Sequence, residues 1–127
     1  MLWGQLGWVA AGGAAGACCR FLLSGWIYQR FSSDFPWGTL VANALGSILF
    51  GALFVLIFSL TSLREPLRLL LLVGFLGAFT TFSTFAFETV RLAQEGQWWL
   101  VAANVIGSNL ACLLGLWIAM TLTRSMV

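Results

Sequence analysis

Charge is what this 127-residue chain has least of. Only 8% of its residues are charged, and none is lysine or histidine, whereas a soluble domain is about one quarter charged. The mean hydropathy is +0.97, so the polar groups are too few to cover a globule in water. These values predict an integral membrane protein.

The missing histidine and the scarce cysteine exclude further classes. The three cysteines, Cys18, Cys19 and Cys112, all fall inside apolar intervals. An odd number in such places favours small packing residues over a disulfide framework. No cysteines cluster at metal-ligand spacing and no nucleophile–base pair is evident. We therefore expect no transition-metal site, no enzymatic activity and no nucleic-acid partner.

Long uncharged intervals fill the chain, at 35–63, 69–87 and 96–123. Each is near or above the roughly 20 residues that a helix needs to cross a bilayer. A further apolar interval near the start is interrupted only by Arg20. We predict a single all-α transmembrane domain over 1–127, with four spans at about 3–28, 37–60, 67–93 and 97–123. An even number of spans places both termini on one side.

The loop charges give almost no preference for one orientation. Arg64, Arg68 and Arg124 fall on the side of the termini, and Arg30 and Arg91 on the other. Because an excess of basic residues normally marks the cytoplasmic side, a three-to-two split leaves two interpretations open. Either the protein is weakly oriented, or copies insert both ways up and pair antiparallel.

Small residues recur at four-residue spacing in three of the spans. Such stripes let helix backbones approach closely in lipid, so they predict tight helix packing and nothing more specific. The stripes are Gly12–Gly16 in the first span, Ala42–Gly46 in the second, and Gly107–Ala111–Gly115 in the fourth.

A few polar side chains lie at membrane depth. Arg20 either reaches the headgroups or pairs structurally, or else attracts an anion. Asn43 lies about two turns into the second span, where an unpaired amide is costly. Asn104 and Ser108 lie one turn apart on the fourth span. We expect interhelical hydrogen bonding for Asn104, whereas for Asn43 and Ser108 a functional role is equally consistent.

The third span contains the unusual stretch "GAFTTFSTFAFE" at 77–88. Gly74 and Gly77 precede the β-branched pair Thr80–Thr81, and both features weaken a helix. A broken helix in lipid is tolerated where it is buried in protein or lines a polar cavity. Its freed carbonyls would suit a hard cation. The alternative is an unbroken helix whose hydroxyls bond to their own turn.

Aromatic and polar residues alternate beyond this point. Phe82 and Phe85 share one helix face, and Thr84 and Glu88 follow on another. Phenylalanines at this spacing usually pack in a core or face lipid. Aromatic ring edges, however, carry positive partial charge and can contact a small anion without trapping it.

Three motifs together resemble one family. "GTLVANALGS" (38–47), "GFLGAFTTFSTFAFE" (74–88) and "GGAAGACCRF" (12–21) resemble the Fluc/CrcB fluoride channels, over essentially the whole chain. The resemblance implies a dual-topology antiparallel homodimer in the bacterial plasma (inner) membrane, with two pores that pass fluoride passively down its gradient. It also implies a structural Na⁺ at the dimer centre.

The resemblance assigns roles residue by residue. The Na⁺ would be held by backbone carbonyls of Gly77 and Thr80, and Arg20 and Glu88 would have vestibular or structural roles. Cys112 stands where relatives carry a hydroxyl. The expected fluoride path comprises Asn43, Phe82, Phe85, Ser83, Thr84 and Ser108.

Two other functions fit a small four-span protein. A dual-topology, proton-coupled drug or cation exporter needs a carboxylate deep in a span, typically the first. Here the first span carries Arg20 instead, and Glu88 lies well along the third. A purely structural membrane subunit would leave Asn43 and the Phe–hydroxyl stretch unexplained.

Overall fold

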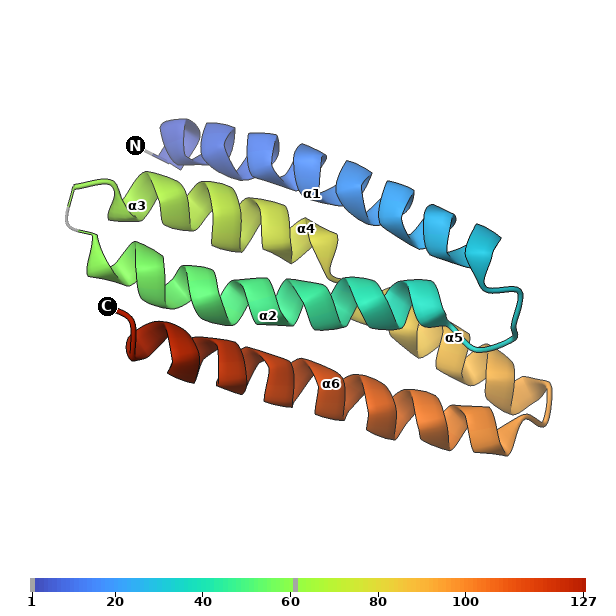
Figure 1. Cartoon of the computed structure of the whole chain (residues 1–127). Helices are drawn as coiled ribbons and strands as arrows, with labels where there is room; N and C mark the ends of the chain where they lie inside the picture. Colours follow the sequence, from blue (N-terminus) through green and yellow to red (C-terminus); the bar gives the residue numbers. More distant parts are fainter. Residues whose placement is uncertain (1, 61) are drawn as a thin grey trace.

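Long helices make up almost the whole chain (Figure 1). The computed structural model describes residues 2–60 and 62–127. The elements are α1 (Leu2–Arg30), α2 (Trp37–Ser59), α3 (Arg64–Leu67), the π-helical segment η1 (Arg68–Leu76), α4 (Gly77–Phe79), α5 (Phe82–Gln94) and α6 (Trp98–Arg124). Within the described ranges there is no strand. Four spans are long and apolar enough to cross a membrane, which confirms the predicted all-α class.

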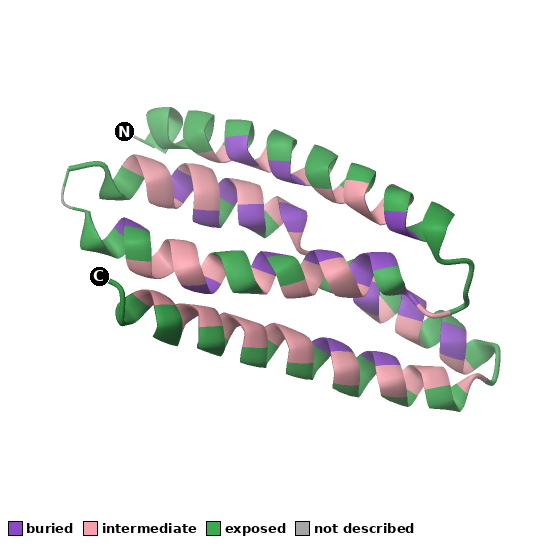
Figure 2. Ribbon diagram, viewed as in Figure 1, coloured by how far each residue is buried: buried purple, intermediate pink, exposed green. Residues whose placement is uncertain are grey.

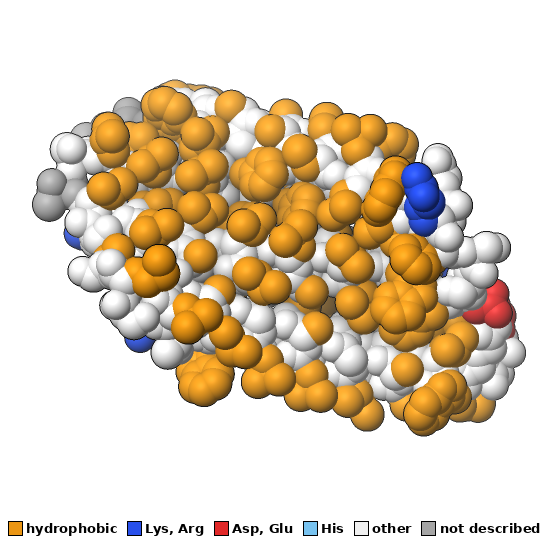
Figure 3. Space-filling view, in the orientation of Figure 1, with side chains coloured by type: hydrophobic (Ala, Val, Ile, Leu, Met, Phe, Trp, Pro, Cys, Tyr) orange, Lys and Arg blue, Asp and Glu red, His pale blue; other side chains and the backbone are white. Residues whose placement is uncertain are grey.

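The outer surface is apolar along most of its length. Large side chains such as Phe21 on α1 and Trp117 on α6 are exposed, and buried residues face the inside of the bundle (Figure 2). On the face drawn in Figure 3, the charged side chains lie at the two ends of the molecule. Both chain termini lie at one of these ends (Figure 1). Hydrocarbon solvates such a surface, whereas water does not.

Two glycines let α1 lie directly against the third span. A methyl group at Gly12 would overlap the Leu70 carbonyl oxygen, and one at Gly16 would overlap the Phe75 carbonyl oxygen. Hydrogen in place of a side chain therefore brings the two backbones together, as the small-residue spacing predicted. This contact fixes the upstream half of the third span.

The contact between α2 and α6 uses only part of the predicted stripe. A Cβ at Gly51 would overlap the Leu116 carbonyl, and one at Gly115 would lie 2.8 Å from the Ile48 side chain. A Cβ at Gly107 would meet nothing within 4 Å. The two helices are therefore in tight contact toward the α6 C-terminus, and Gly107 lies outside that contact because α2 does not approach it.

The third span is broken at two threonines. Thr80 has φ/ψ of −89°/156° and Thr81 has −151°/114°, so both residues are extended. Helix α5 consequently starts again in a new direction, behind α2 in the view of Figure 1. The break confirms the interruption that Gly77 and the threonine pair predict. The π-helical turns ahead of it carry no recognisable signal in the sequence.

Candidate functional site

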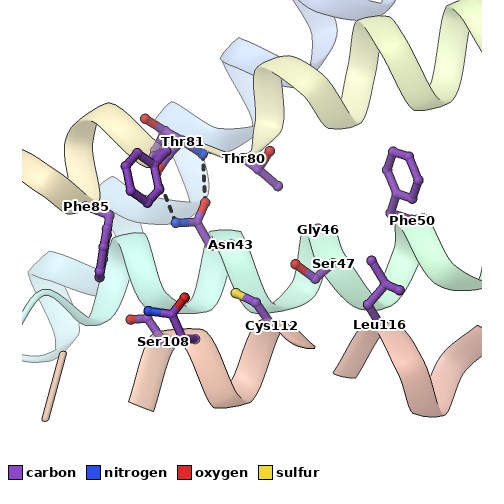
Figure 4. A pocket seen from close by; sticks show the side chains of 12 residues that line it. Asn43, Gly46, Ser47, Phe50, Thr80, Thr81, Phe85, Ser108, Cys112 and Leu116 are labelled. Atoms are coloured by element: carbon purple, nitrogen blue, oxygen red, sulfur yellow. Dashed lines mark hydrogen bonds between the residues drawn. The ribbon is translucent and has the colours of Figure 1, made fainter. Parts of the chain in front are cut away.

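Asn43 of α2 holds the broken segment in place. Its Oδ1 accepts the N–H of Thr81 at 2.7 Å, and its Nδ2 donates to the Thr81 carbonyl at 3.0 Å (Figure 4). The side-chain amide thus pairs with both backbone groups of one extended residue. Lipid offers no partner for such groups, so the break needs this amide at membrane depth.

The break also deprives the carbonyls of residues 77–80 of their helical donors, Gly77 and Thr80 among them. In a continuous helix the N–H of Thr81 would donate to Gly77, and the N–H of Thr84 to Thr80. Instead Thr81 donates to Asn43, and Thr84 donates to the Thr81 Oγ1 at 3.2 Å, which caps α5. The carbonyl oxygens of Gly77 and Thr80 therefore remain available to a ligand, and neutral oxygens of this kind fit a hard cation such as Na⁺.

The Arg20 side chain donates a hydrogen bond to another backbone carbonyl at the break. Its Nε donates to the Ala78 oxygen at 3.0 Å, and the side chain is partly buried. The guanidinium therefore turns inward to the break and does not extend to the headgroups. This position favours structural pairing over snorkelling, and it also brings a positive charge next to the break.

A cavity of about 360 Å³, the central cavity, opens beside the break between α2, α5 and α6 (Figure 4). Four of the predicted path residues line it: Asn43, Phe82, Phe85 and Ser108. Amides, hydroxyls and a thiol alternate with aromatic rings around it. The polar part of the lining is Asn43, Ser47, Thr80, Thr81, Ser108, Asn109 and Cys112.

The two phenylalanines of the central cavity differ in burial. Their ring centroids lie 5.4 Å apart with the planes tilted by 45°. Phe85 is 9% exposed, whereas Phe82 is 78% exposed. Phe85 is therefore part of the packed interior, and Phe82 extends beyond the chain's own packing.

A second cavity, the vestibule, lies on the α1 side of the break and measures about 490 Å³. Three predicted site residues line it together: Arg20, Thr84 and Glu88. Thr81 lines both the vestibule and the central cavity. The broken segment therefore lies between the two cavities.

Two predicted site residues do not line either cavity. Ser83 is exposed, with its Oγ 3.3 Å from the Thr81 Oγ1, and Gly77 is exposed as well. Both face outward from the single chain. The role predicted for each remains a prediction.

The fourth span supplies the expected interhelical bond. Asn104 is buried, and its Nδ2 donates to the Thr89 Oγ1 at 2.9 Å. The Ser108 hydroxyl donates to the Asn104 Oδ1 at 3.0 Å. Asn104 thus ties α6 to α5 and positions Ser108 at the edge of the central cavity.

Sequence reasoning missed Ser47 and Tyr28. Ser47 lines the central cavity one turn after Asn43, and that four-residue spacing was an available signal. Tyr28 donates a hydrogen bond to Glu88. Nothing in the sequence pointed to Tyr28, because the two residues meet only through the fold.

Fold and site together define a small multi-pass membrane protein with polar cavities on both sides of a broken helix. The family model described as CrcB-like protein, Camphor Resistance (CrcB), matches residues 7–120. The chain belongs to this CrcB family.

Three curated relatives match over nearly their full lengths. A protein of Magnetococcus marinus is 47% identical over 94% of this chain and 98% of its own length. Proteins of Citrifermentans bemidjiense and Nitrosococcus oceani are 44% and 39% identical, over 96% and 97% of this chain and 98% of each relative. All three are named fluoride-specific ion channel FluC.

Proposed function

We propose that this protein is a fluoride-selective ion channel of the bacterial plasma membrane. Relatives that are 39% to 47% identical carry that name, and the family is one of transport proteins rather than enzymes. The observation that carries the proposal is the central cavity. Amide, hydroxyl and aromatic groups meet there beside the break, and none of its described lining residues is lysine or arginine.

These groups suit a small, tightly hydrated anion. A pore must replace the water around fluoride with donors, yet must not bind the ion too firmly. The Asn43 amide has two N–H donors, and only one is used on the Thr81 carbonyl. The second is free for an anion, and the ring edges of Phe82 and Phe85 add weak positive potential.

The transport is passive in this proposal. Fluoride that enters a cell as HF and ionises inside leaves down its own gradient, so no coupling ion is needed. A proton-coupled exporter remains the alternative. Such an exporter needs a carboxylate deep in a span, typically the first. The charged residue within the first span here is Arg20, whose side chain is hydrogen-bonded to the Ala78 carbonyl. This contact disfavours the exporter.

Ion efflux from liposomes that contain the purified protein tests this function. Fluoride should leave rapidly once its counter-ion is made permeant, and chloride under the same conditions should not. Equal efflux of both ions would contradict selectivity. Absence of efflux for either would contradict a channel, and a proton-driven flux of organic cations would favour the exporter.

The same proposal includes a homodimer with Na⁺ at its centre. One chain contributes two of the expected carbonyls, those of Gly77 and Thr80, and two oxygens are too few to enclose a hard cation. An antiparallel second copy would double the set. The exposed positions of Gly77 and of the Phe82 ring, 78% of which is accessible in the single chain, are consistent with a partner at this face.

Mass and labelling measurements test this assembly. Light scattering in detergent should give the mass of two chains in Na⁺ and a loss of dimer when N-methylglucamine replaces Na⁺. For topology, Ser125→Cys in a variant without the three native cysteines should label to about half from outside the cell if copies insert both ways. A monomer in both Na⁺ and N-methylglucamine would contradict the dimer. Complete labelling from one side would contradict dual topology.

A further inference from the structure

The Glu88 carboxylate is buried and held by a tyrosine from another helix. Glu88 is 9% exposed, and the Tyr28 hydroxyl donates to its Oε1 at 2.7 Å. The Thr39 Oγ1 lies 3.3 Å from the same tyrosine oxygen. A tyrosine hydroxyl has one proton, and Tyr28 donates it in the hydrogen bond to Glu88. Thr39 must therefore be the donor in the hydrogen bond to Tyr28. The result is a hydrogen-bonded row from Thr39 through Tyr28 to Glu88.

Glu88 has no other partner in the part of the chain that the structure describes. Its Oε2 is buried without a hydrogen bond. The ion pairs among the described residues are Arg68–Glu65 and Arg91–Glu95, and neither includes Glu88. A buried carboxylate is costly unless it is hydrogen-bonded. The Tyr28 hydroxyl is therefore the contact that determines where this charge lies.

Tyr28 and Glu88 stand between two cavities. Besides the vestibule, a cavity of about 340 Å³ lies toward the loop at 31–36, and we call it the outer cavity. Asp34 and Arg91 line the outer cavity, and Arg20 lines the vestibule. Among the residues that the structure describes, only Tyr28 and Glu88 line both. The hydrogen-bonded pair is thus the wall between them.

The tyrosine ring is itself closely packed. A Cβ at Gly38, near the start of α2, would lie 2.7 Å from the Cε2 atom of Tyr28. The ring therefore rests on bare backbone, and this contact holds its hydroxyl toward Glu88. The absence of a side chain at position 38 is what makes room for the ring.

We propose that Tyr28 is a positioning residue for fluoride passage. The inference rests on the proposed channel function. The hydroxyl fixes the Glu88 carboxylate in the wall between vestibule and outer cavity. An anion crossing that wall then meets a charge that is partly neutralised by a donor and cannot swing into its path. Without the hydroxyl, a mobile carboxylate would repel the anion at close range.

A double-mutant cycle on single-channel fluoride currents in planar bilayers tests this role. Tyr28→Phe should lower the current by about tenfold when Glu88 is present. In the Glu88→Gln background, Tyr28→Phe should change the current little relative to Glu88→Gln alone, because the repelling charge is gone. Thr39→Val should cause a smaller loss of current in the same direction, since it removes the donor to the tyrosine oxygen.

The outcomes separate the possibilities. An equal loss of current from Tyr28→Phe in both backgrounds would show that the hydroxyl acts independently of the Glu88 carboxylate and would overturn the proposal. So would an unchanged current with Glu88 in place. If the wild-type protein passes no fluoride, the proposed function itself fails, and the spectroscopic measurement below still reports on the pair.

Tyr28 is the only tyrosine in the chain, so 3-fluorotyrosine labels it alone. Its ¹⁹F resonance should shift on Glu88→Gln, because the strength of the phenol hydrogen bond changes. Glu95→Gln is the matched control, since it makes the same chemical change at an exposed site on the loop after α5. A resonance that is insensitive to Glu88→Gln, or equally sensitive to both changes, would contradict the hydrogen-bonded positioning.

Discussion

Asn43→Asp is expected to abolish most fluoride flux and to destabilise the fold. Aspartate keeps an acceptor for the Thr81 N–H but loses the donor that bonds the Thr81 carbonyl at 3.0 Å. Loss of this hydrogen bond costs about 1 kcal/mol, and a carboxylate oxygen placed against the Thr81 carbonyl oxygen adds electrostatic repulsion. The added negative charge also repels fluoride in the central cavity. We expect a flux decrease of about a hundredfold, measured by liposome efflux, which corresponds to a barrier higher by about 2.8 kcal/mol.

Asn109→Asp is the matched control for the stability effect. Asn109 is exposed on α6, and its Nδ2 donates only to the Val105 carbonyl of its own helix, at 2.7 Å. The thermal stability of this variant in detergent should fall less than that of Asn43→Asp, because Asn109 makes no hydrogen bond to another helix. If Asn43→Asp retained both wild-type stability and wild-type flux, the amide bridge across the break would be unimportant.

Phe82→Ile is expected to have the second large effect, on flux alone. The Phe82 side chain is 78% exposed in the single chain, so its truncation removes few packing contacts within the chain. It does remove a ring edge from the central cavity, and aliphatic carbon has no comparable positive rim. Fluoride current should fall by about tenfold or more, while the protein still purifies as a folded, monodisperse species.

Phe85 and Phe87 provide the comparison. Phe85→Ile should lower both current and thermal stability, because that ring is 9% exposed and its loss leaves a void. Phe87 is 68% exposed and lines none of the three cavities described above. Phe87→Ile should therefore leave the current unchanged. Equal losses from Phe82→Ile and Phe87→Ile would argue against ring edges as fluoride contacts.

The break illustrates how far local sequence signals reach. Gly77 and the pair Thr80–Thr81 weaken a helix through their own backbone preferences, so their neighbourhood indicated where an interruption could occur, with an unbroken helix as the alternative. Polar Asn43 in an apolar span signalled that a partner was needed. Which partner it has, the backbone of Thr81, was not readable, because the two residues are 38 positions apart.

The same limit applies to the charged residues. Arg20 was placed at membrane depth by the sequence, with snorkelling and pairing both open. Its bond to the Ala78 carbonyl joins residues 58 positions apart. The Tyr28–Glu88 bond joins residues 60 positions apart and makes a wall between two cavities. Such contacts depend on how α1 lies against the third span. Gly12 and Gly16 allow the two helices to approach closely, but they do not specify one arrangement.

The amino-acid sequence indicated without the structure that lipid surrounds the chain, that it has four spans, and where the third span could be interrupted. Hydropathy and backbone preference are properties of neighbouring residues, so they can be read along the chain. Tertiary structure decided which polar groups meet: the amide of Asn43 with Thr81, the guanidinium of Arg20 with Ala78, and the phenol of Tyr28 with Glu88. In a membrane these partners come from other helices, because lipid supplies no hydrogen bonds and each unsatisfied group must find its partner within the protein.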